Sequence, residues 1–377
     1  MGPITPKHIL RLSFLALLLA QQSVFALLNI DGGRNQVFVF GSVGFAYDSN
    51  IFAQRGGPSD EVENLTLGGE LNRRAGVIAV NSTLSVAFVR YSRHSDLNAV
   101  DPNLLVEMSK SSGRLTGSLS VNAYRTQQAD SAVNLHTSSW NIPVTLNLRY
   151  PINEKFYATS QTTWQRRQFE DRNAGLSNYS DFSEGVDAFY VYTSKLDLLA
   201  GYRVRFARTD SGRTTDHNFS IGATGTVLPK VNGLVRFGYQ TRLIDGTGQS
   251  FGQVSALGQL TWNATRKLAV TALLSRDFTT TATTVSVDAE AANLSATYTM
   301  TRRFQFETGI SFGRNRFLDQ GEADRVDDFF SWNAGASYSL NEHFKLSGSY
   351  TYFHNLSNLD VAEFNRQQFS VNVNSRF

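Results

Sequence analysis

Apolar and polar residues alternate along almost the whole chain after its first 26 residues. The segment 140–150, WNIPVTLNLRY, places Trp140, Ile142, Val144 and Tyr150 on one face of an extended chain, with mostly polar side chains between them. Because successive side chains of a β-strand point to opposite faces, this pattern predicts a strand with one apolar face. The same alternation recurs at 196–206, 235–243, 304–312, 330–340 and 369–377.

Aromatic residues tend to stand at the ends of these segments, and small or aliphatic residues fill their middles. Strands that cross a membrane show this distribution, because their aromatic side chains lie at the two lipid–water interfaces. Helical periodicity is almost absent. The pattern therefore predicts an all-β protein made of transmembrane strands, and a large soluble β-sandwich or propeller is the alternative.

Short turns and longer polar loops alternate along the chain. Eight short turns are expected at 71–74, 111–114, 151–155, 193–195, 229–233, 264–267, 301–303 and 341–343. Nine longer stretches lie around 48–63, 92–103, 126–136, 170–181, 208–217, 244–250, 278–284, 316–327 and 354–363. Together they predict nine hairpins, an antiparallel up-and-down barrel of about 18 strands (16–18) over residues 27–377. Short turns on one side and longer loops on the other are typical of the bacterial outer membrane, and closure leaves no unpaired strand edge. The external loops are too short to fill the lumen, although one of them can fold inward as a constriction.

The first 26 residues have the features of a secretory signal peptide. Lys7, His8 and Arg11 form a basic start, residues 12–20 (LSFLALLLA) are apolar, and Ala26 is a small residue suited to cleavage. The apolar run is shorter than the ~20 residues that a helix needs to cross a bilayer. We expect 1–26 to be removed on export.

Composition excludes several classes of protein. Removal of Lys7 and Arg11 from the 35 basic residues leaves 33 against 32 acidic ones, a balance that does not suit nucleic-acid binding. The chain has no cysteine, so it has neither disulfides nor thiolate chemistry. The histidines show no metal-ligand spacing, and no G-x-S-x-G elbow is present. We therefore expect no enzyme activity, no metal and no cofactor.

The chain ends on an aromatic residue in register with the last alternating segment. Phe369, Val371, Val373 and Phe377 share one face, whereas Ser375 interrupts the apolar series. This ending resembles the terminal signal of bacterial outer-membrane barrels. The resemblance implies that Phe377 is read by the barrel assembly machinery and that outer-membrane lipid surrounds the protein.

The segment YDSNIF (47–52) lies at the end of the first predicted strand. Tyr47, Asp48, Asn50, Ile51 and Phe52 resemble a motif of a family of Gram-negative outer-membrane β-barrel porins associated with exopolysaccharide secretion. The resemblance implies passage of polysaccharide, with periplasmic export components as partners. The polar residues of the segment are equally suited to closing a strand with a turn.

Charged residues alternate with the lipid-facing ones and are therefore expected in the lumen. The basic candidates for lining a pore are Arg149, Arg167, Arg203, Arg205, Arg236 and Arg242, and the acidic candidates are Asp277, Asp288, Glu290 and Glu307. Opposed charges across a water-filled constriction select solutes by charge. The same charges can instead pair with one another and brace the wall.

These observations predict a porin-like barrel, because about 16–18 strands leave room for an aqueous channel. Passage or export of polysaccharide is the preferred interpretation. A general diffusion porin and a surface structural or adhesion barrel without transport are the alternatives.

Overall fold

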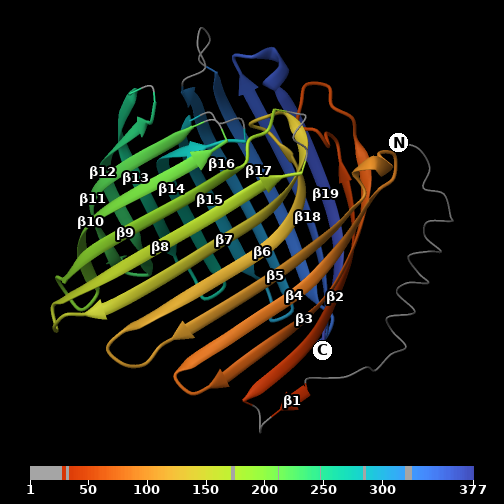
Figure 1. Ribbon diagram of the computed structural model, residues 1–377. Coiled ribbons are helices and arrows are strands. Elements are labelled where there is room, and N and C mark those ends of the chain that lie inside the picture. Colours follow the sequence, from red (N-terminus) through yellow and green to blue (C-terminus); the bar gives the residue numbers. More distant parts are fainter. Residues whose placement is uncertain are drawn as a thin grey trace.

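The computed structural model describes residues 28–30, 34–170, 175–210, 212–246, 248–282, 286–318 and 325–377. Within these ranges, eighteen long antiparallel strands, β2 to β19, form one sheet that closes where β19 pairs with β2 (Figure 1). The short strand β1 (Leu28–Ile30) pairs with the start of β2. The predicted barrel is thus confirmed. The expected signal peptide lies outside the described residues.

Each strand pairs with its neighbours in sequence. The strands of the first half of the barrel are β2 (Asn35–Asp48), β3 (Asp60–Ala75), β4 (Ile78–Tyr91), β5 (Ala99–Lys110), β6 (Thr116–Asp130), β7 (Leu135–Pro151), β8 (Phe156–Phe169), β9 (Tyr179–Val191) and β10 (Leu196–Thr209). Those of the second half are β11 (Arg213–Leu228), β12 (Val231–Ile244), β13 (Ser250–Trp262), β14 (Leu268–Thr280), β15 (Ser286–Thr299), β16 (Phe304–Leu318), β17 (Val326–Ser339), β18 (Phe344–Ser357) and β19 (Phe364–Arg376). Two single-turn 3₁₀ helices, η1 (Ser95–Leu97) and η3 (Asp360–Ala362), lie in loops. No helix in the described part of the chain is long and apolar enough to cross a membrane.

The apolar members of the alternating segments lie on the outside of the barrel. Phe237 and Tyr239 of β12 and Phe219 of β11 are all more than half exposed, and Phe219 and Tyr239 are register partners. The exposed Phe369, Val371 and Val373 of β19 occupy the same face as predicted. An outer wall of exposed aromatic and aliphatic side chains suits contact with lipid.

The first short turn lies beyond its predicted position. Residues 71–74 belong to β3, and the chain turns at 76–77, where Gly76 has a φ of +74°. Glycine takes this left-handed conformation without steric cost, whereas Arg73 and Arg74 only have a turn-like composition. The other seven short turns fall at or beside the predicted positions.

The backbone of the last residue extends the ladder between β19 and β2 that closes the sheet. The amide nitrogen of Val39 donates to the carbonyl oxygen of Phe377 at 3.0 Å, and that of Phe377 donates to Val39 at 2.8 Å. The Phe377 ring stacks on His343 and meets the edge of Phe344. Phe377 therefore completes the seam between β19 and β2.

Candidate functional site

The pairing of β13 with β14 stops partway up the barrel wall. Register partners run from Trp262 and Val270 to Ala256 and Arg276. Beyond that point β13 continues to pair with β12 as far as Ser250, and β14 continues to pair with β15. The upper part of the hairpin β14–β15 therefore parts from the wall strand next to it.

Two arginines from other strands bind the backbone of this hairpin. Arg205 of β10 donates from Nη2 to the carbonyl oxygen of Phe278, and Arg242 of β12 donates from Nη1 to that of Thr279 at 2.8 Å. The Arg242 guanidinium also lies over the Phe278 ring, 5.0 Å from its centroid. The part of β14 that no longer pairs with β13 thus receives hydrogen bonds from two guanidinium groups, and the carbonyl oxygen of Phe278 finds a donor in Arg205.

Asp216 of β11 holds both arginines in place. Its carboxylate accepts two hydrogen bonds from Arg242, at 2.7 and 2.8 Å, and another from Nε of Arg205 at 2.7 Å. The Arg242 side chain is fully buried, and that of Asp216 is 7% exposed. Charge-assisted bonds of this kind are short and directional, so this trio forms a rigid support beneath the hairpin.

The tip of the hairpin β14–β15 contacts the end of β8 and the loop that follows it. Ala282 packs against Phe169, the last residue of β8, and against Leu176. The amide of Ser177 donates to the carbonyl oxygen of Ala282 at 2.7 Å. Because β9 to β12 stand between β8 and β13 in the sheet, the hairpin crosses the inner face of four strands. It forms the inward-folding constriction that the sequence allowed.

Two further ion pairs line the lumen and remain partly exposed. Arg203 donates to Asp277 at 2.7 Å, with side chains 37% and 34% exposed. Arg236 donates to Asp187 at 2.7 Å, with side chains 25% and 19% exposed. Gly201 makes the second pair possible, since a Cβ there would lie 1.8 Å from Asp187 Oδ1.

The remaining basic candidates stack on aromatic rings. Arg149 lies 4.0 Å from the centroid of Tyr157, which stacks on Phe189 at 4.5 Å. Arg167 lies over the Phe169 ring and is 3.7 Å from Asp130. The rings of Tyr157 and Phe189 thus face each other and a guanidinium. The last acidic candidate, Glu307, is exposed. Its carboxylate lies over Gly335, in the space that a side chain would occupy there.

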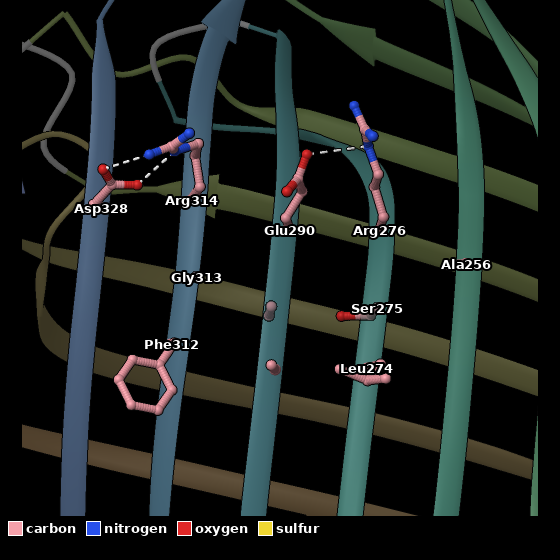
Figure 2. Close-up of a pocket in the computed structure, with 11 residues that line it drawn as sticks. Ala256, Leu274, Ser275, Arg276, Glu290, Phe312, Gly313, Arg314 and Asp328 are labelled. Atoms are coloured by element: carbon pink, nitrogen blue, oxygen red, sulfur yellow. Dashed lines mark hydrogen bonds and ion pairs between the residues drawn. The ribbon is translucent and has the colours of Figure 1, made fainter.

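Asp288 and Glu290 do not belong to this lumen cluster, and their expected inward position is wrong. Glu290 is the register partner of both Arg276 and Arg314, and the next row on the same face, two residues along, contains the exposed Phe312. Asp288 bonds to Arg276 at 2.8 Å. Figure 2 shows Arg276, Glu290 and Arg314 on the near side of the wall, with the opposite wall behind it. Asp277 pairs with Ala289, so residues 288 and 290 occupy the other face of the hairpin.

Three acids in the lumen were missed by sequence reasoning: Asp181, Asp187 and Asp216. Phe182 and Val186 of β9 are exposed on the outer wall, so their odd-numbered neighbours point inward. The alternation thus contained the signal for Asp181 and Asp187. The role of Asp216 could not be read, because it depends on two arginines from different strands.

Loops from several hairpins also meet over the longer-loop mouth. Arg325, beside β17, donates to the carbonyl oxygens of Ala132 at 2.7 Å and Ser131 at 3.1 Å. Asn134 donates to that of Ala53 at 2.7 Å. The segment YDSNIF participates here: its buried Asn50 donates to Gln54, and its Asp48 accepts from Arg366 across the closing seam.

In the described ranges no group of His, Asp or Glu residues is arranged to hold a metal ion.

Comparison with known proteins agrees with this geometry. A family described as "Putative beta-barrel porin 2" matches residues 201–377, somewhat less than half of the chain. Comparison with curated proteins finds no match. Among solved structures, Acinetobacter baumannii OccAB2 is 11% identical with a TM-score of 0.51, covering 91% of this chain and 98% of its own. Pseudomonas aeruginosa OccK5 (OpdH) is 11% identical with a TM-score of 0.50 and the same coverage. Acinetobacter baumannii OccAB3 is 9% identical with a TM-score of 0.50, covering 91% of this chain and 99% of its own.

At these identities the structural likeness concerns the fold, and the half-chain match points to the same class. The closed barrel, its exposed apolar outer wall and these matches agree. The chain is a porin-like β-barrel of the bacterial outer membrane.

Proposed function

We propose that the protein is a passive channel for small polar solutes, with its narrowest part beside the hairpin β14–β15. The observation that carries this proposal is the contact of Ala282 with Phe169 and Leu176, which draws the hairpin across the inner face of the wall. A barrel of this size otherwise has room for a wide aqueous lumen. A segment crossing it sets an upper limit on solute size.

The charged residues of the lumen fall into two groups with different roles. Arg205 and Arg242 are buried on Asp216 and brace the hairpin. The pairs Arg203–Asp277 and Arg236–Asp187 keep a third to a fifth of their side-chain surface exposed. Of these two groups, the exposed pairs are the ones that can meet a solute beside the hairpin, whereas the exposed Arg149 and Glu307 lie elsewhere on the wall. Because each pair contains one positive and one negative charge, the pairs favour dipolar, hydroxyl-rich solutes over strongly charged ones.

Passage of polysaccharide remains the finer alternative implied by the resemblance of YDSNIF. A polymer chain would require the hairpin to move, and its three supports, Arg203, Arg205 and Arg242, oppose that movement. A surface structural or adhesion barrel is the other alternative. It requires no open lumen.

Swelling of liposomes that contain the purified protein tests the proposal. Neutral sugars of increasing length are added outside, and their entry is followed by light scattering. We expect monosaccharides and disaccharides to enter and long oligosaccharides to be excluded. Entry of long oligosaccharides at similar rates would favour a polysaccharide passage, whereas exclusion of every sugar by correctly folded protein would favour a barrel without transport.

The double variant R205Q/R242Q makes the test specific to the hairpin. It should admit longer sugars than the unmodified protein, because the hairpin loses both backbone donors. R314Q is the matched control, since Arg314 pairs with Asp328 on the outer wall. Its size limit should equal that of the unmodified protein.

A further inference from the structure

Lysine is confined to one rim of the barrel. Of the seven lysines in the chain, one lies in the first 26 residues. The other six lie in or within two residues of short turns, one to a turn: Lys110, Lys155, Lys195, Lys230, Lys267 and Lys345. Short turns face the periplasm in barrels of this kind. The wall and the longer loops use arginine as their only permanent cation.

The two short turns without a lysine have arginine pairs instead. Arg73 and Arg74 end β3 beside the turn at 76–77, and Arg302 and Arg303 lie in the turn at 300–303. All eight short turns between the barrel strands therefore carry a permanent positive charge. The only acids in or within two residues of these turns are Glu154, Asp197 and Glu342. We call this set of turn lysines and arginines the basic ring.

Part of the basic ring is fixed along the rim itself. Lys267 donates to the carbonyl oxygen of Met300 at 2.8 Å, and Lys230 donates to that of Ala264 at 3.4 Å. Each bond joins one turn to the next. These contacts hold the ammonium groups level with the ends of the strands and leave their charge uncompensated.

Other members of the ring have no such contact. Lys155, Lys195, Arg266 and Arg302 are exposed, and their side chains make no hydrogen bond or ion pair with any residue in the described ranges. Their charge is therefore available to a ligand outside the barrel.

Exposed aromatic side chains lie directly beside the basic ring on the outer wall. Trp262 is 49% exposed at the end of β13, and Tyr192 is 61% exposed in the turn after β9. Tyr150 is also exposed, with the Arg114 guanidinium 4.9 Å from its ring centroid. Amphipathic rings next to long cationic side chains are characteristic of the lipid headgroup region.

We propose that the basic ring binds the phosphate groups of anionic phospholipids in the periplasmic leaflet. The even distribution of charge over all eight turns supports this occupant, because lipid surrounds the whole circumference. A folded partner protein would contact one sector of the rim. Basic side chains at a membrane surface attract anionic lipid, so the ring should enrich such lipid around the barrel.

Fluorescence of Trp262 provides the test. The triple variant W140F/W164F/W332F leaves Trp262 as the single tryptophan, four and five residues before Arg266 and Lys267 of the turn. The protein is folded into mixed vesicles of phosphatidylglycerol and phosphatidylcholine, in which only one of the two lipids has brominated acyl chains. At the same mole fraction, we expect the quenching of Trp262 by brominated phosphatidylglycerol to be at least about twice that by brominated phosphatidylcholine. Salt at ~0.5 M should largely remove the difference.

Charge variants separate specific binding from non-specific quenching. In the same single-tryptophan background, K230Q/R266Q/K267Q should lower the preference for the anionic lipid. The matched control R55Q/R90Q/R93Q removes three exposed cations from the opposite end of the barrel and should leave the preference intact. Equal quenching by both lipids in the unmodified ring, or a preference that salt and K230Q/R266Q/K267Q leave unchanged, would overturn the proposal. Folding of each variant is checked independently by its electrophoretic mobility before and after heating.

Discussion

Nη1 of Arg242 donates a 2.8 Å hydrogen bond to the carbonyl oxygen of Thr279, so a side chain of β12 holds the part of β14 that has parted from β13. In a lipid-embedded sheet an unpaired strand edge costs several kcal/mol for each unsatisfied group. The hairpin β14–β15 avoids this cost by turning its free edge to guanidinium groups of the lumen. The constriction and the gap in the ladder therefore have one physical origin.

Loss of Arg242 should destabilise the barrel and widen the lumen. Arg242→Ala leaves the buried Asp216 with Arg205 alone and frees the Thr279 carbonyl. Removal of one partner of a buried ion pair costs about 3–5 kcal/mol. We expect the free energy of unfolding in urea to fall by about 3 kcal/mol. Arg314→Ala, on the exposed outer wall, should change it far less, and equal losses in the two variants would contradict the role assigned to Arg242.

The corrected position of Glu290 has a direct consequence for ion selectivity. Asp277→Asn removes a negative charge from the lumen and leaves Arg203 without its partner. This variant should shift the reversal potential in a salt gradient toward anion selectivity. Glu290→Gln should leave it unchanged, because Glu290 lies on the outer wall with Arg276. A shift of equal size in both variants would show that Glu290 faces the lumen.

A side chain at position 201 should displace the carboxylate of Asp187. Alanine at this position would place a Cβ 1.8 Å from the Asp187 carboxylate and separate it from Arg236. We expect Gly201→Ala to alter single-channel conductance while the barrel still folds, since strands tolerate alanine. Gly258→Ala is the control, because its Cβ would make only an ordinary contact with Leu274 at 3.7 Å. Unchanged conductance in Gly201→Ala would show that the Arg236 pair does not border the path of ions.

Acid should weaken one anchor of the longer loops. Glu170 accepts hydrogen bonds from Nε and Nη2 of Arg125, which lower the pKa of its carboxyl below the usual 4.5. A group with a lowered pKa in the folded state stabilises the fold above its unfolded pKa and loses that effect as the pH falls through the folded value. Glu170→Gln should therefore lower stability modestly at pH 7, by less than about 1 kcal/mol because the side chain is partly exposed. The difference from the unmodified protein, measured by urea unfolding, should shrink as the pH falls below 4.5.

Phe377 is predicted to act in assembly as well as in closure. Phe377→Ala keeps the backbone bonds to Val39 but removes the ring that packs on His343 and Phe344. We expect slower folding in the presence of purified assembly machinery, and a smaller effect on spontaneous folding into detergent. Equal slowing in both conditions would reduce Phe377 to a packing residue.

The alternation of side chains was sufficient to predict the barrel, the outward face and the inward arginines. Among their partners, Asp187 could be read from the same alternation, whereas Asp216 could not, because its role depends on two arginines from different strands. Glu290 was misplaced although the alternation of β15 contained the signal: Leu294 and Tyr298 are exposed on the outer wall, and Glu290 lies on the same face of the strand. The inward turn of Phe278 and Thr279 gave no local signal, since it depends on donors from β10 and β12.

The central claim is that the hairpin β14–β15 limits the lumen while it is attached to the opposite loop. Because the chain has no cysteine, the pair L176C/A282C can form a single disulfide between residues that already pack together. Single-channel conductance is measured with the bond formed and again after reduction. The cysteine pair is introduced together with R205Q/R242Q, whose hairpin has lost its arginine donors. We expect a stable, low conductance while the disulfide is formed, and a higher or fluctuating conductance after it is reduced. The same conductance before and after reduction would contradict the claim, because the hairpin would then lie outside the path of the ions.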